Sequence, residues 1–581
     1  MTTPPSTRTE PAAPDEPASR LQAVGAPSPL AGRTFWLILG AITAIGFGVR
    51  AVHILGSDFP LNDGGLFFAM ARDLQAHHYL LPAFTSYNGG ALPFAYPPLG
   101  FYLAALLDDW TPFALIDLFR LLPLLYSSLT IVAFGVLARR LLQSDIAALA
   151  AAVAFALVPR SFIWLLMGGG VARALGLLLA LLALHEAYRL YTTGRRRYLV
   201  SGALLSAATV LSHVETAWFL AFSIVLLFLT YGRTRQQLAN SVVLAGAATL
   251  LAAPWWIRVV ATHGLAPFLH ANGTVGSVFS DGAMARELFL ALARVTATSE
   301  PLFPLIGALS ILGALVAIRA RQFMLPVWWV LIILLDARAF PTFTTIPVAL
   351  LAGHALVQIV LPLTRRSTRN ASTPVADRST PATFPALPAA RDWRGGSLGT
   401  VLIGGTLLLY MLGGSLVRAP GFGGEGHFLV GLTSGERAAF EWIDANTPAT
   451  SRILILPRGP WPADKEGEWL PVLTARVSAA TVQGSEWTGR FEAQVRAYDA
   501  AWSCGYGVAD CLGRWSSTYD TPFTHLYIPS TDQGQCCGTL LVSLRQSAQY
   551  SLLYEGPGGT IFGTHGPLAP LASPASPASP R

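Results

Sequence analysis

Charged side chains are scarce in this sequence of 581 residues. Asp, Glu, Lys and Arg make up 12% of it, about half of their share in an average soluble domain, whereas hydrophobic residues make up 52%. This composition excludes an ordinary soluble protein and is typical of a polytopic membrane protein. Because the sequence is more polar after residue 418, we expect a membrane domain followed by a soluble one.

Several common signatures are also missing. The sequence has no phosphate-cradling P-loop, no defensible Ser-His-Asp order, no internal repeat and no cysteine before residue 504. The net charge of +7 alone would be compatible with nucleic-acid binding, but most basic residues stand in short clusters between apolar runs. We therefore expect membrane lipid, and no nucleic acid, as a partner.

The N-terminal part predicts a tail and an anchor. Residues 1–33 are rich in Pro, Ala, Ser and Thr without apolar periodicity, which predicts a disordered cytoplasmic tail. The apolar run 34–56 comes too late for an ordinary cleavable signal peptide. It is long enough to cross about 30 Å of hydrocarbon and predicts an uncleaved signal anchor.

Basic clusters set the orientation of the later spans, because short cytoplasmic loops are enriched in Lys and Arg. With the N-terminus inside, each cluster that follows an apolar run, such as 195–197, falls on the cytoplasmic side. About eleven transmembrane helices are predicted, at residues 34–56, 119–138, 146–165, 171–191, 198–213, 216–231, 239–260, 301–318, 323–336, 342–362 and 397–416.

This path divides the chain into a membrane domain, 34–362, a flexible cytoplasmic linker, 363–396, and a last span. The loop 57–118 and everything after residue 418 then lie outside the cytoplasmic membrane. The outer part, 418–565, predicts an α/β domain, and the low-complexity end, 566–581, a disordered tail. In that domain we expect helices from residue 434 and at 486–502 and 539–547, and strands at 452–456, 478–482, 524–528, 550–554 and 559–563.

The four cysteines, Cys504, Cys511, Cys536 and Cys537, all lie in this outer domain. Their spacing fits no common zinc pattern, and an even number in an oxidising compartment favours disulfides over the alternative of four buried free thiols. A bond between adjacent cysteines belongs to the most strained of the three pairings. We therefore favour two bridges that join Cys504 and Cys511 to Cys536 and Cys537.

The outer loop after the first span carries the clearest motif. Asn62-Asp63-Gly64-Gly65 is followed by a helix-like run, 66–75, and then by Tyr96-Pro97-Pro98-Leu99-Gly100-Phe101-Tyr102. The apolar run 97–107 is too short to cross a bilayer and predicts an interfacial or re-entrant helix.

These residues resemble the first extracytoplasmic loop of the GT-C superfamily, membrane glycosyltransferases that take sugars from polyprenyl-phosphate carriers. The superfamily includes protein O-mannosyltransferases, aminoarabinose transferases and the catalytic subunit of oligosaccharyltransferase. The resemblance implies an inverting glycosyltransferase that moves a sugar from a polyprenyl-phosphate donor to an extracytoplasmic acceptor of the cell envelope. Many relatives have a second acid beside the loop aspartate, where this chain has Gly64, so the use of a divalent metal, Mg²⁺ or Mn²⁺, stays open.

Such a transfer needs a base for the acceptor hydroxyl and cations for the departing phosphate. Asp63 is the candidate base; the alternative is that Asn62 or Asp63 caps the helix 66–75. Arg173 and Arg338 break the basic-inside pattern and are candidates for phosphate binding, with snorkelling to lipid headgroups as the alternative.

Five further residues are candidates for the substrate site. Arg50 and His53 lie three apart, on one face of the first span, and Tyr96 opens the Tyr-Pro-Pro motif. His213 and Glu215 lie at an outer junction of two spans and are candidates for a metal or the acceptor, provided that the helix ends there, because residues two apart on a helix point to different sides.

Two non-enzymatic hypotheses compete with the transferase. The first is a GT-C-like protein that has lost catalysis and displays its outer domain to cell-envelope partners, and Gly64 favours it slightly. The second is a transporter of lipid-linked saccharides, which should have charged or broken spans near the middle of the membrane.

Overall fold

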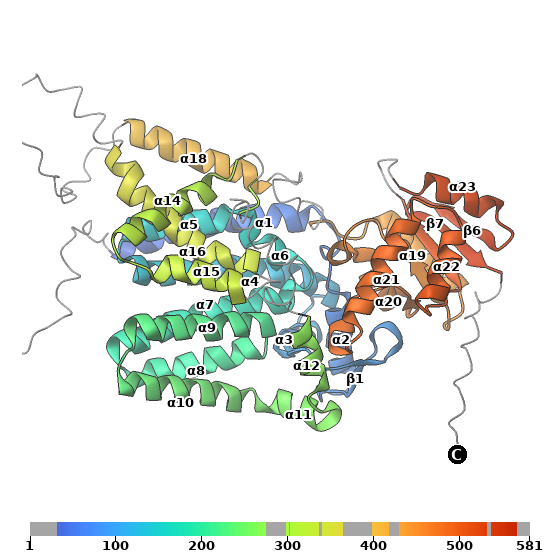
Figure 1. Cartoon of the computed structure of the whole chain (residues 1–581), viewed down its shortest axis with the longest axis horizontal. Coiled ribbons are helices and arrows are strands. Elements are labelled where there is room, and N and C mark those ends of the chain that lie inside the picture. Colours follow the sequence, from blue (N-terminus) through green and yellow to red (C-terminus); the bar gives the residue numbers. More distant parts are fainter. Residues whose placement is uncertain are drawn as a thin grey trace, which may run out of the picture.

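The computed structural model describes residues 32–274, 298–300, 303–335, 340–363, 398–416, 429–530 and 536–565. The expected tails, nearly all of the expected linker and Arg338 lie outside these ranges. Within them the molecule is elongated, with a helical bundle at one end and a domain that contains a β-sheet at the other (Figure 1).

A helix lies at every position where a span is predicted. The bundle helices are α1 (Gly32–Leu55), α4 (Leu115–Leu142), α5 (Asp145–Leu157), α7 (Gly170–Thr193), α8 (Arg196–Val210), α9 (Val214–Tyr231), α10 (Arg235–Leu251), α11 (Ala253–His263), α14 (Leu305–Arg319), α15 (Met324–Leu335), α16 (Phe340–Ala355) and α18 (Leu398–Leu416). Short helices α6 (Ile163–Leu166) and α12 (Ala266–Gly273) and the 3₁₀ turn η3 (Pro159–Ser161) join them, and the π-helical segment η4 (Leu356–Val360) extends α16.

Five helices in the described part of the chain are long and apolar enough to cross a membrane, and the pair α10 and α11, bent by 59°, makes up to six. Helices α5, α14 and α15 and the segment Gly404–Leu416 are apolar but shorter. These helices are those of a multi-pass membrane protein. Eleven crossings remain a prediction.

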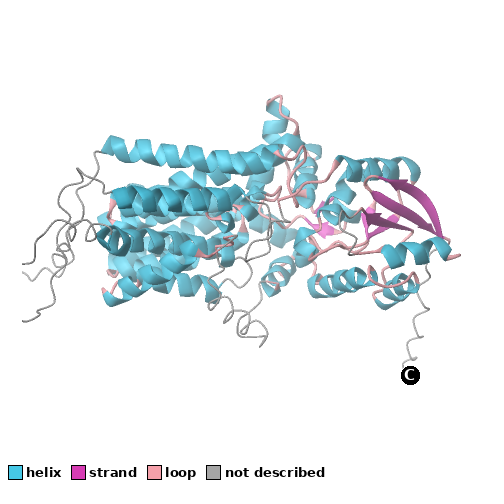
Figure 2. Cartoon of the chain, turned by 90° about the horizontal axis from the view of Figure 1, so that it is seen from above, coloured by secondary structure: helices cyan, strands magenta, loops and turns pink. Residues whose placement is uncertain are grey.

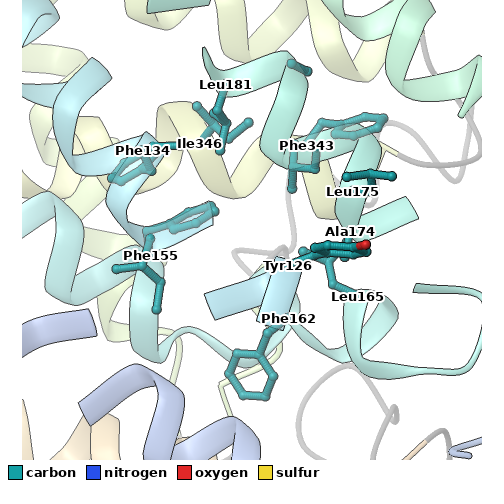
Figure 3. Packing of buried hydrophobic residues seen from close by; sticks show 14 of the residues in the cluster. Tyr126, Phe134, Phe155, Phe162, Leu165, Ala174, Leu175, Leu181, Phe343 and Ile346 are labelled. Atoms are coloured by element: carbon teal, nitrogen blue, oxygen red, sulfur yellow. The ribbon is translucent and has the colours of Figure 1, made fainter. Parts of the chain in front are cut away.

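Aromatic rings and close backbone contacts hold the bundle together. Phe134 of α4 stacks on Phe155 of α5 with ring centroids 4.3 Å apart, as Figure 3 shows. A Cβ on Gly313 would lie 2.0 Å from the carbonyl oxygen of Leu351, and one on Gly353 would lie 2.5 Å from that of Ala147. Helix α16 therefore approaches α14 and α5 through glycines. In lipid the hydrophobic effect does not drive helices together, and small residues commonly allow the close packing that does.

The loop after α1 folds over the end of the bundle. It contains α2 (Gly65–Ala76), a two-stranded hairpin of β1 (Phe84–Thr85) and β2 (Leu92–Pro93), the turn η2 (Tyr87–Gly89) and α3 (Leu99–Trp110). Helix α2 forms where the helix-like run is predicted. Helix α3 occupies the apolar run 97–107, and its 12 residues span only about 18 Å.

The domain at the other end has a five-stranded mixed sheet with helices on both sides (Figure 2). The strands, in the order β4-β3-β5-β7-β6, are β4 (Val477–Ser478), β3 (Arg452–Ile455), β5 (His525–Pro529), β7 (Gly559–Thr564) and β6 (Tyr550–Gly556). Strand β3 is parallel to β4 and β5, and β7 is antiparallel to β5 and β6. A strand occurs near each predicted position.

The helices of this domain are α19 (Ser434–Asn446), α20 (Lys465–Thr474), α21 (Phe491–Cys504), α22 (Asp510–Thr518) and α23 (Gly538–Gln546), with turns η6 (Trp461–Ala463) and η7 (Ser485–Trp487). Sequence reasoning anticipated α19, α21 and α23 but missed α20 and α22. Each of the missed helices has ten residues or fewer, and α20 contains both Gly467 and Pro471, which disfavour a helix in isolation.

Trp469 of the sheet domain contacts the loop that follows α1. Its indole Nε1 donates a hydrogen bond to the carbonyl oxygen of Asn62 at 2.9 Å, and its ring lies 4.8 Å from that of Phe59. Leu61 also forms a β-bridge with Gly431. Because Trp469 is completely buried, we take these contacts to be part of the fold.

The disulfides differ from the favoured pairing. All four cysteines are bonded, but Cys504 pairs with Cys511, and Cys536 pairs with its neighbour Cys537. The cross-pairing favoured from the sequence is therefore wrong. The turn after α21 brings Cys511 back to Cys504 within the same segment, with the two Cα atoms 5.5 Å apart, a return path that spacing alone does not reveal.

We predict that native protein digested without reduction gives one peptide group that joins Cys504 to Cys511 and another in which Cys536 and Cys537 are bonded to each other. Mass mapping, with a reduced digest as the control, measures this pairing. Crosslinks between the two pairs, or four thiols that react with an alkylating reagent in the native protein, would contradict it.

Candidate functional site

The loop residues Leu61 to Gly64 lie directly on the turn that precedes α7. The amide of Gly168 donates to the carbonyl oxygen of Leu61 at 2.9 Å. Gly64 has a φ of 119°, and a Cβ there would lie 2.9 Å from the backbone of Gly168. A Cβ on Gly168 would lie 2.1 Å from the carbonyl oxygen of Asp63. The loop and the turn can approach this closely only because residues 64 and 168 are both glycine. No second acid therefore fits at position 64.

This approach places the Asp63 carboxylate at the N-terminal end of α7. Oδ1 accepts a hydrogen bond from the amide of Gly169 at 2.8 Å, and Oδ2 lies 2.6 Å from Nη1 of Arg173. The two side chains are only 15% and 18% exposed. Removing one partner of such an enclosed pair leaves an uncompensated charge, at a cost of about 3 to 5 kcal/mol.

Neither alternative role for these residues matches the geometry. Helix α2 follows Gly64, which has no side-chain cap, so neither Asp63 nor Asn62 caps it. The side-chain amide of Asn62 instead donates from Nδ2 to the carbonyl oxygen of Pro462 at 2.7 Å. Arg173 turns towards Asp63, and its Nε donates to the carbonyl oxygen of Trp164 at 3.1 Å. It is therefore not a snorkelling residue.

The remaining guanidinium nitrogen of Arg173 is available. Nη2 is buried and has no hydrogen-bond partner in the described part of the chain. A guanidinium that shares one face with a carboxylate and has a further N–H group free is suited to bind an additional anionic oxygen.

Tyr96 belongs to the wall of the same site. Its ring packs against those of Phe67, Phe101, Trp487 and His213, with centroids 4.6, 5.8, 5.7 and 6.2 Å away. It also lies close enough to Arg173 to interact electrostatically with it. Tyr96 thus connects the Asp63 pair to the junction that holds His213.

The helix does end at this junction, as a joint role of His213 and Glu215 requires. His213 is the N-cap of α9, and its Nδ1 accepts from the amide of Thr216 at 3.3 Å. Its Nε2 lies 4.0 Å from the Glu215 carboxylate. The imidazole is thereby oriented by the helix end, with Glu215 beside it.

Arg50 and His53 connect helices inside the bundle. Arg50 is fully buried and donates to Ser127 Oγ, at 3.0 Å, and to the carbonyl oxygens of Gly46 and Ala156. His53 Nε2 bonds the carbonyl oxygen of Ser415 at 2.8 Å. These contacts give both residues a packing role inside the bundle.

Sequence reasoning missed one residue of the site, Glu468 of α20. It is 3% exposed, and its Oε1 accepts a hydrogen bond from the amide of Gly64, the residue after Asp63, at 2.8 Å. Burial, and then the negative charge of Asp63, raise the pKa of Glu468 to about 8. Nothing in the local sequence distinguishes this acid from its neighbour Glu466, so only the tertiary contact identifies it.

The donor set does not form a ready metal site. In the described ranges no three His, Cys, Asp or Glu residues are grouped so that they could hold an ion. The two Asp63 oxygens face Gly169 and Arg173, and a cation beside a guanidinium would be repelled. Among the described residues, this donor set therefore does not fit a divalent metal.

No protein-family model and no curated protein sequence matches the chain. Solved structures do. ArnT from Cupriavidus metallidurans in the apo state matches with a TM-score of 0.50 and 15% identity, over 92% of this chain and 98% of that one. The oligosaccharyltransferase from Archaeoglobus fulgidus in the apo form matches with a TM-score of 0.50 and 13% identity, over 86% and 70%. The arabinofuranosyltransferase AftD from Mycobacteria matches with a TM-score of 0.48 and 17% identity, over 93% and 42%.

The ArnT and oligosaccharyltransferase structures belong to the GT-C superfamily. The chain therefore has the fold of a GT-C membrane glycosyltransferase, and the resemblance expected from the Asn62 to Gly65 and Tyr96 to Tyr102 motifs is confirmed at the level of the fold. At this identity the likeness shows the architecture alone.

We predict that Gly168→Ala lowers the free energy of unfolding by about 1 to 3 kcal/mol, because its methyl group would collide with the Asp63 backbone. Gly40→Ala in α1, where a Cβ meets nothing within 4 Å, is the matched control and should leave stability near wild type. Thermal melts of the purified proteins in detergent measure both. Equal melting temperatures for wild type and Gly168→Ala would show that the loop does not depend on this contact.

Proposed function

We propose that the chain is an integral membrane glycosyltransferase that moves a sugar from a polyprenyl-phosphate donor to an extracytoplasmic acceptor. The observation that carries the proposal is the enclosed pair of Asp63 and Arg173 at the end of the bundle, with one N–H group of the guanidinium free to bind an anion. The shared architecture with membrane glycosyltransferases supports the same reaction class.

Each side chain has a chemical task in this reaction. The acceptor oxygen bonds to the anomeric carbon while the bond from that carbon to the phosphate oxygen breaks, and the electron pair of that bond stays on the phosphate. Asp63 takes the proton of the acceptor hydroxyl. Arg173 stabilises the growing charge on the phosphate, and attack from the face opposite the leaving phosphate inverts the anomeric centre.

The neighbouring residues divide the remaining work. Tyr96 and the rings around it form an apolar surface on which a sugar can stack. His213 and Glu215 lie beyond Tyr96 and are placed to contact the acceptor. Arg50 and His53 stabilise the bundle that holds these groups.

We also propose that the loop 57–118 and the sheet domain are both extracytoplasmic. The contact between Trp469 and Asn62 supports a common side for them. Two segments on the same side are separated by an even number of crossings. Since one span, α1, precedes the loop, the total must then be odd, which agrees with the eleven crossings predicted from the basic clusters. As part of the same arrangement we propose a membrane domain at 34–362 with the last span at 397–416, and an outer domain at 418–565.

We predict that Asp63→Asn folds but lowers turnover by about 100-fold or more, because the amide still accepts from Gly169 but takes no proton. Its melting temperature should also fall, since Arg173 loses its counter-charge. Turnover with a polyprenyl-phosphate sugar and a thermal melt are measured on one preparation.

Asp58→Asn is the matched control for this variant. Asp58 lies in the same loop and is paired with Arg437 at 2.5 Å, but its side chain is 72% exposed. Both its turnover and its stability should stay near wild type, because exposed ion pairs contribute little. Wild-type turnover in Asp63→Asn would remove the catalytic assignment and favour the non-catalytic hypothesis.

For the orientation, we predict that a reporter active only in the cytoplasm is silent when it is fused after residue 565. The same reporter fused after residue 364, in the expected cytoplasmic linker, should be active and serves as the control. A cytoplasmic signal from the first fusion would place the sheet domain, and the loop that contacts it, inside.

A further inference from the structure

Two buried polar atoms of the site have no hydrogen-bond partner among the residues that the structure describes. They are Nη2 of Arg173 and Oε2 of Glu468. A buried polar atom without a partner loses its hydration without compensation. A ligand that bonded both atoms would supply the missing contacts.

The two atoms belong to side chains that reach Asp63 from different parts of the fold. Arg173 comes from α7 and bonds the Asp63 carboxylate, whereas Glu468 comes from α20 and bonds the next amide, that of Gly64. Helix α20 is tightly apposed to the loop that holds Asp63, because a Cβ on Gly65 would lie 2.4 Å from the carbonyl oxygen of Glu468. Glu468 interacts electrostatically with both Asp63 and Arg173.

The protonation of Glu468 determines which ligand fits. Burial, and then the charge of Asp63, raise its pKa to about 8, so at pH 7 it is mostly a neutral carboxylic acid. With Oε1 accepting from Gly64, the proton resides on Oε2, which makes that atom a donor. The guanidinium N–H is also a donor. Two free donors in one enclosed site suit an anion and disfavour a cation.

We propose that Glu468, as a protonated carboxylic acid, binds the phosphate of the polyprenyl-phosphate donor together with Arg173. The inference rests on the proposed function and adds a phosphate-binding residue to it. The second carboxyl group of the site thus comes from the sheet domain, and it acts as a hydrogen-bond donor while Asp63 remains the base.

A test must distinguish the titration of Glu468 from that of the groups around it. The titratable and charged groups around Glu468 and its helix are Asp63, Arg173, Tyr87, Asp464, Lys465, Glu436, Arg458, Glu466 and Glu486. Burial raises the pKa of Tyr87 well above its usual value, so this residue stays neutral. Burial, and then the charge of Glu466, raise the pKa of Asp464 to about 7, which makes Asp464 the group to control for.

The experiment is calorimetric binding of farnesyl phosphate to the purified full-length protein between pH 7 and pH 9.5, with farnesol as the probe without phosphate. The second ionisation of a phosphate monoester lies near pH 6, below this window. We expect wild-type affinity to fall about tenfold between pH 7 and pH 9, because ionised Glu468 loses its donor proton and repels the phosphate. Farnesol binding should not change.

Four variants assign the effect. Glu468→Gln keeps an uncharged N–H donor, so it should bind as wild type does at pH 7 and lose the pH dependence. Asp464→Asn, in which Asn can still accept from the amide of Gly467 as Asp464 does, should keep the wild-type pH dependence. Arg173→Gln should bind more weakly at every pH. Glu468→Asp keeps the carboxyl group on a shorter side chain and is used in case Glu468→Gln does not fold. It should bind more weakly than wild type and retain a pH dependence.

The outcomes separate this inference from the proposed function. A pH dependence that persists in Glu468→Gln, or is lost in Asp464→Asn, overturns the role of Glu468. So does wild-type affinity that does not vary with pH. If Arg173→Gln alone weakens binding, the inference fails and the proposed function stands. If wild-type protein binds no farnesyl phosphate at any pH, both fail.

Discussion

The ion pair between Asp63 and Arg173 is the constraint on which the rest of the site depends. Two charges are enclosed where solvent cannot stabilise them, so each requires the other to be in place. That requirement joins the first loop to the start of α7. It explains why the contact surface consists of glycine backbone, since a side chain on either Gly64 or Gly168 would separate the charges. Helix α20 then adds Glu468 to a site that the loop has already shaped.

The replacement of the second acid by Gly64 has a different meaning in the structure than in the sequence. Read along the chain, it indicates a damaged motif. In three dimensions the backbone of Gly168 occupies the space where a side chain at position 64 would lie. The carboxyl group of Glu468, from the sheet domain, accepts a hydrogen bond from the amide of Gly64. A carboxyl group that is missing from the motif in the sequence can therefore be supplied by a distant residue in the fold. The absence of an acid at position 64 is weak evidence for loss of activity.

Sequence reasoning succeeded where the signal is local. Apolar runs located the helices. An acid just after the first span and an arginine outside the basic-inside pattern made Asp63 and Arg173 separate candidates. Their contact could not be derived, because it depends on how two turns pack. Glu468 was out of reach because its helix contains Gly467 and Pro471, and its partner amide is 404 positions away. The disulfide pairing failed for a similar reason, since the path of the chain decides it.

The separation between Gly64 and Glu468 also has a consequence for biogenesis. The membrane helices are synthesised and leave the ribosome long before α20 exists, so a newly inserted bundle contains Asp63 and Arg173 without their third partner. If both loop and domain are outside, α20 must be translocated and folded before Glu468 can reach the amide of Gly64. The chain would thus acquire its complete site only at the end of its own synthesis, and a product truncated before α20 would retain Asp63 and Arg173 but lack Glu468.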